Sequence, residues 1–164
     1  MPILDSRTLE FFSRSPEQTR RLGIRLGALL QPGDLLCLSG DLGSGKTTLV
    51  QGLAQGWGTF DNVSSPTFVL VNVYRRPDKR CLYHLDAYRL VSALEAEDLD
   101  VEDMLAAGPL VVEWPEHIKP VLPAECLWLT LRWVADEQRG MVFRSQGARY
   151  DELLAEFRKR VFGG

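Results

Sequence analysis

The sequence has no long apolar run. Hydrophobic residues make up 45% of its 164 positions, but they lie in short stretches, whereas a membrane-spanning helix needs roughly 20 consecutive apolar residues. The segment from Met1 to Arg7 also lacks the basic and then apolar layout of a secretory signal peptide. We therefore expect a cytoplasmic protein without a membrane segment.

An excess of positive charge is also missing. The chain carries 22 acidic and 19 basic residues, which gives a formal net charge of −3. Such a balance provides no general attraction to nucleic acid or to an anionic membrane surface. Any contact with either would need a local patch or a partner protein.

Cysteine is scarce. The three cysteines, Cys37, Cys81 and Cys126, are odd in number and far apart in the sequence. Disulfide frameworks and metal sites need other counts or closer spacings. We interpret the three as buried thiols of a reducing compartment.

The length fits one globular domain over residues 1–164 with a core of its own. The pattern Ser15-Pro16-Glu17-Gln18 predicts a helix that starts at Pro16 and ends before Pro32. Apolar runs and helical spacing predict the remaining elements. We expect strands over 9–12, 34–39, 68–74, 81–85, 109–113, 127–133 and 141–144, and further helices over 46–57, 94–105 and 150–162.

The run from Gly40 to Thr47 fits the P-loop pattern of glycine, four residues, glycine, lysine and then serine or threonine. Glycines allow positive φ angles and close backbone approach, so that successive N–H groups can bind phosphates. The following helix directs its positive dipole end at the same place. We expect this segment to bind ATP through Gly40, Asp41, Leu42, Gly43, Ser44, Gly45, Lys46, Thr47 and Thr48.

Two carboxylates follow apolar strands, as a magnesium site beside a P-loop requires. They are Asp86 and Glu113, and we expect them to be catalytic together with Lys46. Thr47 offers a hydroxyl to Mg²⁺, and both carboxylates are candidate ligands beside it. Either carboxylate could place the attacking water, and the sequence leaves that choice open.

Four other features have plainer interpretations. His84, in a predicted strand, is more often a half-buried structural histidine than a chemical group, and Trp114 is more often a core aromatic. The basic tip from Arg75 to Arg80 is usually a solvated turn. The hydroxyl-rich segment 63–68 could sense a γ-phosphate or simply form a turn.

The large P-loop classes carry second motifs that can be sought. The Asn-Lys-x-Asp motif of GTPases does not occur, and the chain is too short for a transporter ATPase with its helical subdomain. A small-molecule kinase fits by size, but it would need an arginine-bearing lid over the phosphates.

The whole pattern resembles the TsaE family, the small ATPases of bacterial tRNA threonylcarbamoyladenosine modification. Four ordered motifs carry the resemblance over residues 15–147: GDLGSGKTTL at 40–49, VSSPTF at 63–68, LYHLDAYRL at 82–90 and VEWPE at 112–116. The chain departs from the family's common residues at Ser44, Ala87 and Asp100, none of them a fixed chemical position.

The resemblance implies a P-loop NTPase-like three-layer α/β/α fold with a mixed, mostly parallel central sheet. It also implies that Thr47 and Glu113 hold the magnesium ion. It further implies nucleotide contacts from Ser15, Thr19 and Arg139. By the same resemblance the chain would be an ATPase that resets a TsaD–TsaB complex and meets tRNA only through that complex. Two alternatives remain: a nucleotide-gated assembly module in which hydrolysis is incidental, and a small-molecule kinase.

Overall fold

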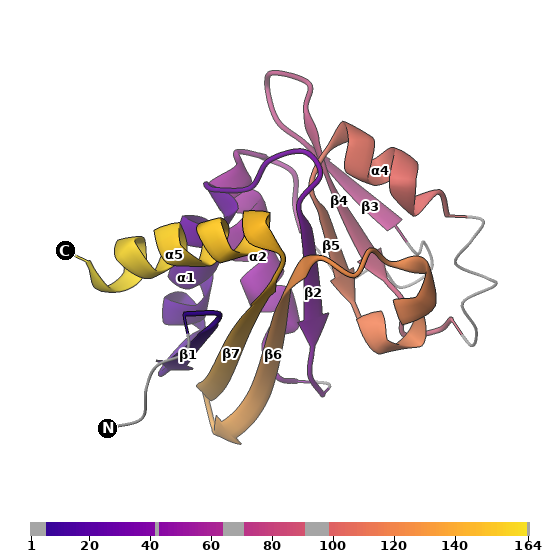
Figure 1. Cartoon of the computed structure of the whole chain (residues 1–164). Helices are drawn as coiled ribbons and strands as arrows, with labels where there is room; N and C mark the ends of the chain where they lie inside the picture. Colours follow the sequence, from indigo (N-terminus) through magenta and orange to yellow (C-terminus); the bar gives the residue numbers. More distant parts are fainter. Residues whose placement is uncertain (1–5, 42, 64–70, 91–98, 164) are drawn as a thin grey trace.

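The computed structural model describes residues 6–41, 43–63, 71–90 and 99–163. Helices are interspersed with strands along the chain (Figure 1). They are β1 (Thr8–Ser13), α1 (Pro16–Gly27), β2 (Leu35–Ser39), α2 (Lys46–Trp57), β3 (Val71–Arg75), β4 (Cys81–Asp86), α4 (Val101–Ala107), β5 (Leu110–Glu113), η1 (Pro115–His117), η2 (Lys119–Val121), β6 (Cys126–Ala135), β7 (Gln138–Gln146) and α5 (Ala148–Phe162). Strands β3 and β4 follow each other directly, as do β6 and β7.

The strands form one seven-stranded sheet in the order β1-β7-β6-β2-β5-β4-β3. Its centre is parallel, because β2 pairs with β5 and β6, and β5 pairs with β4. The outer pairs β1–β7, β6–β7 and β3–β4 are antiparallel. The expected mixed α/β fold is confirmed, with the parallel pairings at its centre and antiparallel pairings at both sides.

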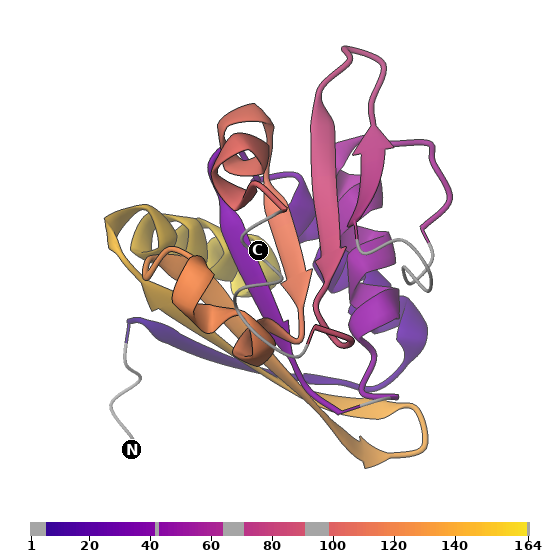
Figure 2. The same cartoon turned by 90° about the vertical axis from the view of Figure 1, so that its right-hand side faces the viewer.

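Helices cover both faces of the sheet (Figures 1 and 2). Side chains of α1, α2 and α5 pack on one face in a core that includes Leu26, Leu53 and Phe157. On the other face, Met104 of α4 and Ile118 beside η1 belong to a second core. The fold therefore has three layers.

Helices α1 and α2, on the first face, approach each other to backbone contact. A Cβ at Gly23 of α1 would lie 2.6 Å from the Leu49 carbonyl oxygen of α2. A Cβ at Gly56 of α2 would collide with the Ile24 carbonyl, and Gly27 and Gly52 are similarly enclosed by the opposite helix. Glycine at these positions sets how closely α1 packs on α2, and so how α2 sits on the sheet.

The sequence predicted most elements with small shifts, and the differences have local causes. Expected segments 68–70 and 94–98 lie outside the described residues. Helix α4 begins only at Val101, after Asp100, which takes the left-handed conformation at φ 52°. Strands β6 and β7 are longer than predicted, because polar residues alternate with apolar ones toward their hairpin turn at Asp136.

The thiols differ from one another in burial. Cys37 and Cys126 are buried as expected, whereas Cys81 is half-buried at the start of β4. Its Sγ lies 3.7 Å from the Lys79 carbonyl oxygen that accepts its weak hydrogen bond. The expectation of three buried thiols is wrong for Cys81, because β4 begins at an exposed hairpin tip. Within the described part of the chain, no helix is long and apolar enough to span a bilayer.

Candidate nucleotide site

The glycine-rich loop connects the central strand β2 to helix α2. Gly40, Gly43 and Gly45 have φ angles of 147°, 79° and 102°, a region that L-residues with a Cβ rarely adopt. A Cβ at Gly40 would collide with the Leu131 carbonyl of β6, whereas one at Gly43 would meet nothing within 4 Å. The start of the loop therefore lies in close contact with β6, whereas a side chain at Gly43 would have space around it.

Helix α2 begins at Lys46, directly after the loop. Gly45 is its N-cap in the left-handed conformation, and its carbonyl accepts from the Leu49 N–H at 3.0 Å. The first N–H groups of a helix have no partner within the helix and carry a partial positive charge. This end of α2 can therefore receive an anion, as the sequence predicted.

Lys46 is buried and held from two sides. Its Nζ donates to the Gly40 carbonyl oxygen at 2.5 Å and lies 4.0 Å from the centre of the Trp114 ring. Burial lowers the pKa of this ammonium, while the nearby Glu113 and Asp86 act in the opposite direction. Trp114 is thus more than a core aromatic, since its ring supports the loop lysine.

The two predicted carboxylates are neighbours in the sheet. Asp86 of β4 stands directly beside Glu113 of β5 in the parallel register, at the carboxyl ends of both strands. Asp86 is half-buried and accepts from the Tyr88 N–H at 2.9 Å. Burial raises the pKa of Asp86, and the adjacent charge of Glu113 raises it further. A cation bound here would offset the repulsion between the two carboxylates.

Glu113 is held by a buried chain of hydrogen bonds. Its Oε2 lies 2.6 Å from His84 Nε2, and His84 Nδ1 lies 2.9 Å from the Tyr74 hydroxyl oxygen. His84 is fully buried. Sequence reasoning missed this role, although His84 precedes Asp86 by two positions and therefore shares its face of the strand.

Arg139, one of the residues expected to contact the nucleotide, lies beside the loop. Ser13 of β1 pairs with Arg139 of β7, and a Cβ at Gly45 would lie 3.6 Å from Arg139 Cγ. The Arg139 guanidinium donates to the carbonyls of Asp136 and Gln138 at 2.7 and 2.9 Å. Arg139 therefore borders the loop.

Ser15 and Thr19 have structural partners. The Ser15 hydroxyl caps α1 by accepting from the Gln18 N–H at 3.1 Å. Thr19 is buried, and its hydroxyl lies 2.6 Å from the Ser13 hydroxyl. Helix capping and internal packing account for both side chains without a ligand.

The basic tip is held by contacts within the chain. The Arg76 guanidinium stacks on the Trp57 ring at 3.9 Å and pairs with Asp78 at 2.8 Å. Arg80 lies 3.8 Å from the same carboxylate. These contacts favour the solvated turn over a nucleic-acid surface.

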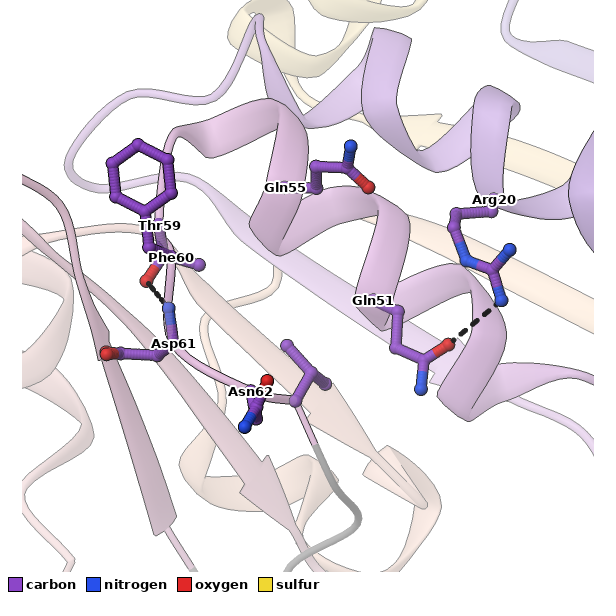
Figure 3. A pocket seen from close by; sticks show the side chains of 8 residues that line it. Arg20, Gln51, Gln55, Thr59, Phe60, Asp61 and Asn62 are labelled. Carbon is purple, nitrogen blue, oxygen red and sulfur yellow. Dashed lines mark hydrogen bonds between the residues drawn. The ribbon is translucent and has the colours of Figure 1, made fainter.

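A separate hollow of about 430 Å³ runs along α2 (Figure 3). Arg20 of α1 donates to Gln51 of α2 at 3.4 Å on one side of it. Exposed Phe60 lies on the other side (Figure 3). None of its lining residues belongs to the glycine-rich loop. Of segment 63–68, residues 64–68 lie outside the described residues.

The strand, the glycine-rich loop, the helix that it opens and the carboxylates at neighbouring strand ends define a class. The chain is a P-loop-type nucleotide-binding protein by architecture. Comparison with known proteins identifies the family. The model described as "Threonylcarbamoyl adenosine biosynthesis protein TsaE" matches residues 13–141, and the chain belongs to the TsaE family, which takes part in tRNA threonylcarbamoyladenosine biosynthesis.

Relatives cover nearly the whole chain. The tRNA threonylcarbamoyladenosine biosynthesis protein TsaE of Bacillus subtilis is 36% identical over 92% of this chain and 94% of its own length. The protein of the same name from Streptomyces coelicolor is 45% identical over 80% of this chain and 93% of its own. The crystal structure of B. subtilis YdiB matches with a TM-score of 0.78 and 31% identity, over 94% of this chain and 96% of that one.

Proposed function

We propose that this chain binds ATP with Mg²⁺ and hydrolyses it to reset a complex of a TsaD-like transferase and a TsaB-like scaffold. One observation carries the proposal: Asp86 stands beside Glu113, and both influence the buried ammonium of Lys46 in the glycine-rich loop. A lysine, two carboxylates and the N–H groups at the start of a helix are the parts that phosphoryl transfer uses. The threonylcarbamoyl transfer itself would belong to the partner.

The donor set fits a nucleotide and a magnesium ion. Mg²⁺ is usually bound by one or two carboxylates together with phosphate oxygens and water, and Glu113 with the Thr47 hydroxyl would supply the protein ligands. Ser44 Oγ is buried and, among the described residues, has no hydrogen-bond partner. Leaving a buried hydroxyl without a hydrogen-bond partner costs roughly 1–3 kcal/mol of stability. A phosphate oxygen would accept the missing hydrogen bond.

The residues of the site would have separate roles in phosphate binding and in hydrolysis. Backbone N–H groups from Gly43 to Thr48 would bind the phosphates. Lys46 would give up its hydrogen bond to the Gly40 carbonyl oxygen and donate to a phosphate oxygen instead. Its positive charge would offset the negative charge that develops there. Magnesium, when bound, would polarise the transferred phosphoryl group. Asp86 or Glu113 would orient the attacking water, with the glutamate held in place by His84.

The test compares Glu113→Gln with Lys46→Ala. The matched controls are Glu102→Gln in α4 and Lys159→Ala in α5, at two exposed side chains. We expect wild-type hydrolysis to be slow alone and faster with both partners. Glu113→Gln should retain ATP binding but lose turnover by about 100-fold or more, and Lys46→Ala should lose binding as well. Calorimetry without magnesium-dependent affinity for adenine nucleotides would contradict the proposal.

Two further measurements distinguish the alternatives. If cells carrying Glu113→Gln still modify their tRNA, ATP binding suffices and the chain is an assembly module. A small-molecule kinase would place labelled γ-phosphate on an acceptor, whereas a hydrolase releases it as inorganic phosphate.

A further inference from the structure

Trp133 is an exposed indole on the same face of the sheet as the glycine-rich loop. Side chains alternate along β6, so Trp133 shares a face with Leu129 and Leu131. Those two leucines are buried in the core beneath α1 and α2. Trp133 lies two residues beyond that core and keeps 60% of its surface exposed.

The strand register places Trp133 next to the residues that border the loop. Ser13 of β1 pairs with Arg139 of β7, and Arg139 pairs with Trp133 of β6. Directly opposed residues of antiparallel strands have Cβ atoms about 4.5–5.5 Å apart. Together the three residues form one transverse row, which we call the wall row.

The wall row adjoins the loop through Arg139, and β6 contacts the loop two residues before Trp133. The Arg139 side chain would meet a Cβ at Gly45, and the Leu131 carbonyl, two residues before Trp133, would meet one at Gly40. Both views show the β6–β7 hairpin extending past the end of β2 from which the loop departs (Figures 1 and 2). The wall row therefore flanks the place where the phosphates would lie.

Other exposed aromatic residues are placed differently. Phe12 is 46% exposed, and alternation along β1 puts it on the opposite face from Ser13. Tyr88 lies against Trp114 with ring centres 5.0 Å apart, and Phe162 lies 6.2 Å from Phe11. Phe60 belongs to the separate hollow. Of these, Trp133 is the aromatic in the row beside Arg139.

We propose that Trp133 is the platform on which the nucleobase of the bound nucleotide stacks. This inference rests on the proposed nucleotide binding and adds the group that holds the base. An indole face stacks on any base, because every base has a π-face. Trp133 should therefore contribute affinity for nucleotides generally, without choosing adenine over guanine.

The experiment measures affinities for ATP and for inorganic tripolyphosphate, both with magnesium, by calorimetry. Tripolyphosphate has the phosphates without a base. We expect Trp133→Ala to weaken ATP binding by about 10- to 100-fold, the range for loss of one base–aromatic stack, with tripolyphosphate affinity unchanged. Trp133→Phe should restore most of the ATP affinity, and the control Phe12→Ala should change neither.

Each outcome bears on the proposal. Equal ATP affinity in Trp133→Ala and wild type would overturn it, and lost partner binding in that variant would then assign the indole to a protein interface. An equal loss for ATP and tripolyphosphate would overturn it as well, since it would indicate a disturbed loop. If wild type binds tripolyphosphate as tightly as ATP, the base adds no affinity, so the base contact fails while phosphate binding stands. If it binds neither, the proposed function itself fails.

Discussion

At the residue scale, the hydrogen-bond chain behind Glu113 decides how that carboxylate is oriented. A buried carboxylate needs partners, because leaving one unsatisfied costs about 1–3 kcal/mol or more. His84 provides that partner at 2.6 Å, and Tyr74 fixes the imidazole from its other nitrogen. We assign His84 and Tyr74 as positioning residues that act through Glu113.

His84→Leu keeps most of the volume and removes both hydrogen bonds. We expect it to lower the free energy of unfolding by roughly 1–3 kcal/mol and to weaken the magnesium dependence of ATP binding. Tyr74→Phe removes the hydroxyl that bonds His84 and also accepts from Asn72 at 3.4 Å, and each lost hydrogen bond should cost about 0.5–1.5 kcal/mol. Urea denaturation and calorimetry with and without magnesium measure the two effects.

The matched control is Tyr83→Phe, because Tyr83 is half-buried on the same strand as His84 but belongs to the core of the other face. It should leave the magnesium dependence unchanged. A purely structural role for His84 would be indicated by lost stability with an unchanged magnesium dependence in His84→Leu.

At the scale of elements, the glycines between α1 and α2 fix the distance of the loop helix from its neighbour. Alanine raises helix propensity by about 1 kcal/mol over glycine, so propensity favours Gly56→Ala. The added Cβ would, however, collide with the Ile24 carbonyl of α1, and backbone cannot move aside as a flexible side chain can. Overpacking of this kind costs about 1–3 kcal/mol.

We therefore predict that Gly56→Ala destabilises the protein, as measured by the midpoint of urea denaturation. Gln55→Ala is the control, since Gln55 is the exposed neighbour on the same helix and gains propensity without a collision. A stability gain in both variants would show that α1 and α2 separate easily.

The elements also show what sequence can predict. The loop, Lys46, Asp86 and Glu113 could be found because each depends on local chemistry: a motif, or an acid after an apolar strand. The contact of His84 with Glu113 could not, since it depends on the register of β4 against β5. The row of Ser13, Arg139 and Trp133 likewise depends on pairing between the first strand and the last two.

At the scale of the whole molecule, charge distribution sets the affinity for tRNA that we expect of the isolated chain. A formal charge of −3 and the contacts of the tip residue Arg76 with Asp78 and Trp57 leave little attraction to the phosphate backbone of tRNA. We expect the isolated chain to bind tRNA no more tightly than about 10⁻⁴ M at physiological salt, the weak end of nonspecific binding.

Filter binding at several salt concentrations measures this affinity. Charge removal at Arg75 and Lys79, whose side chains are exposed, serves as the comparison and should change nothing. Tight, salt-sensitive binding that this double variant abolishes would instead assign the tip a direct role in tRNA recognition.

The position of β2 has a consequence for biosynthesis. Its two sheet neighbours, β5 and β6, both leave the ribosome long after it does. The glycine-rich loop and α2 are therefore made early but cannot settle until the later strands arrive, because long-range pairing must first bring them together. A nascent chain interrupted before β6 would lack the strand whose Leu131 carbonyl contacts Gly40. We therefore expect a nascent chain to bind nucleotide only when its translation is nearly complete.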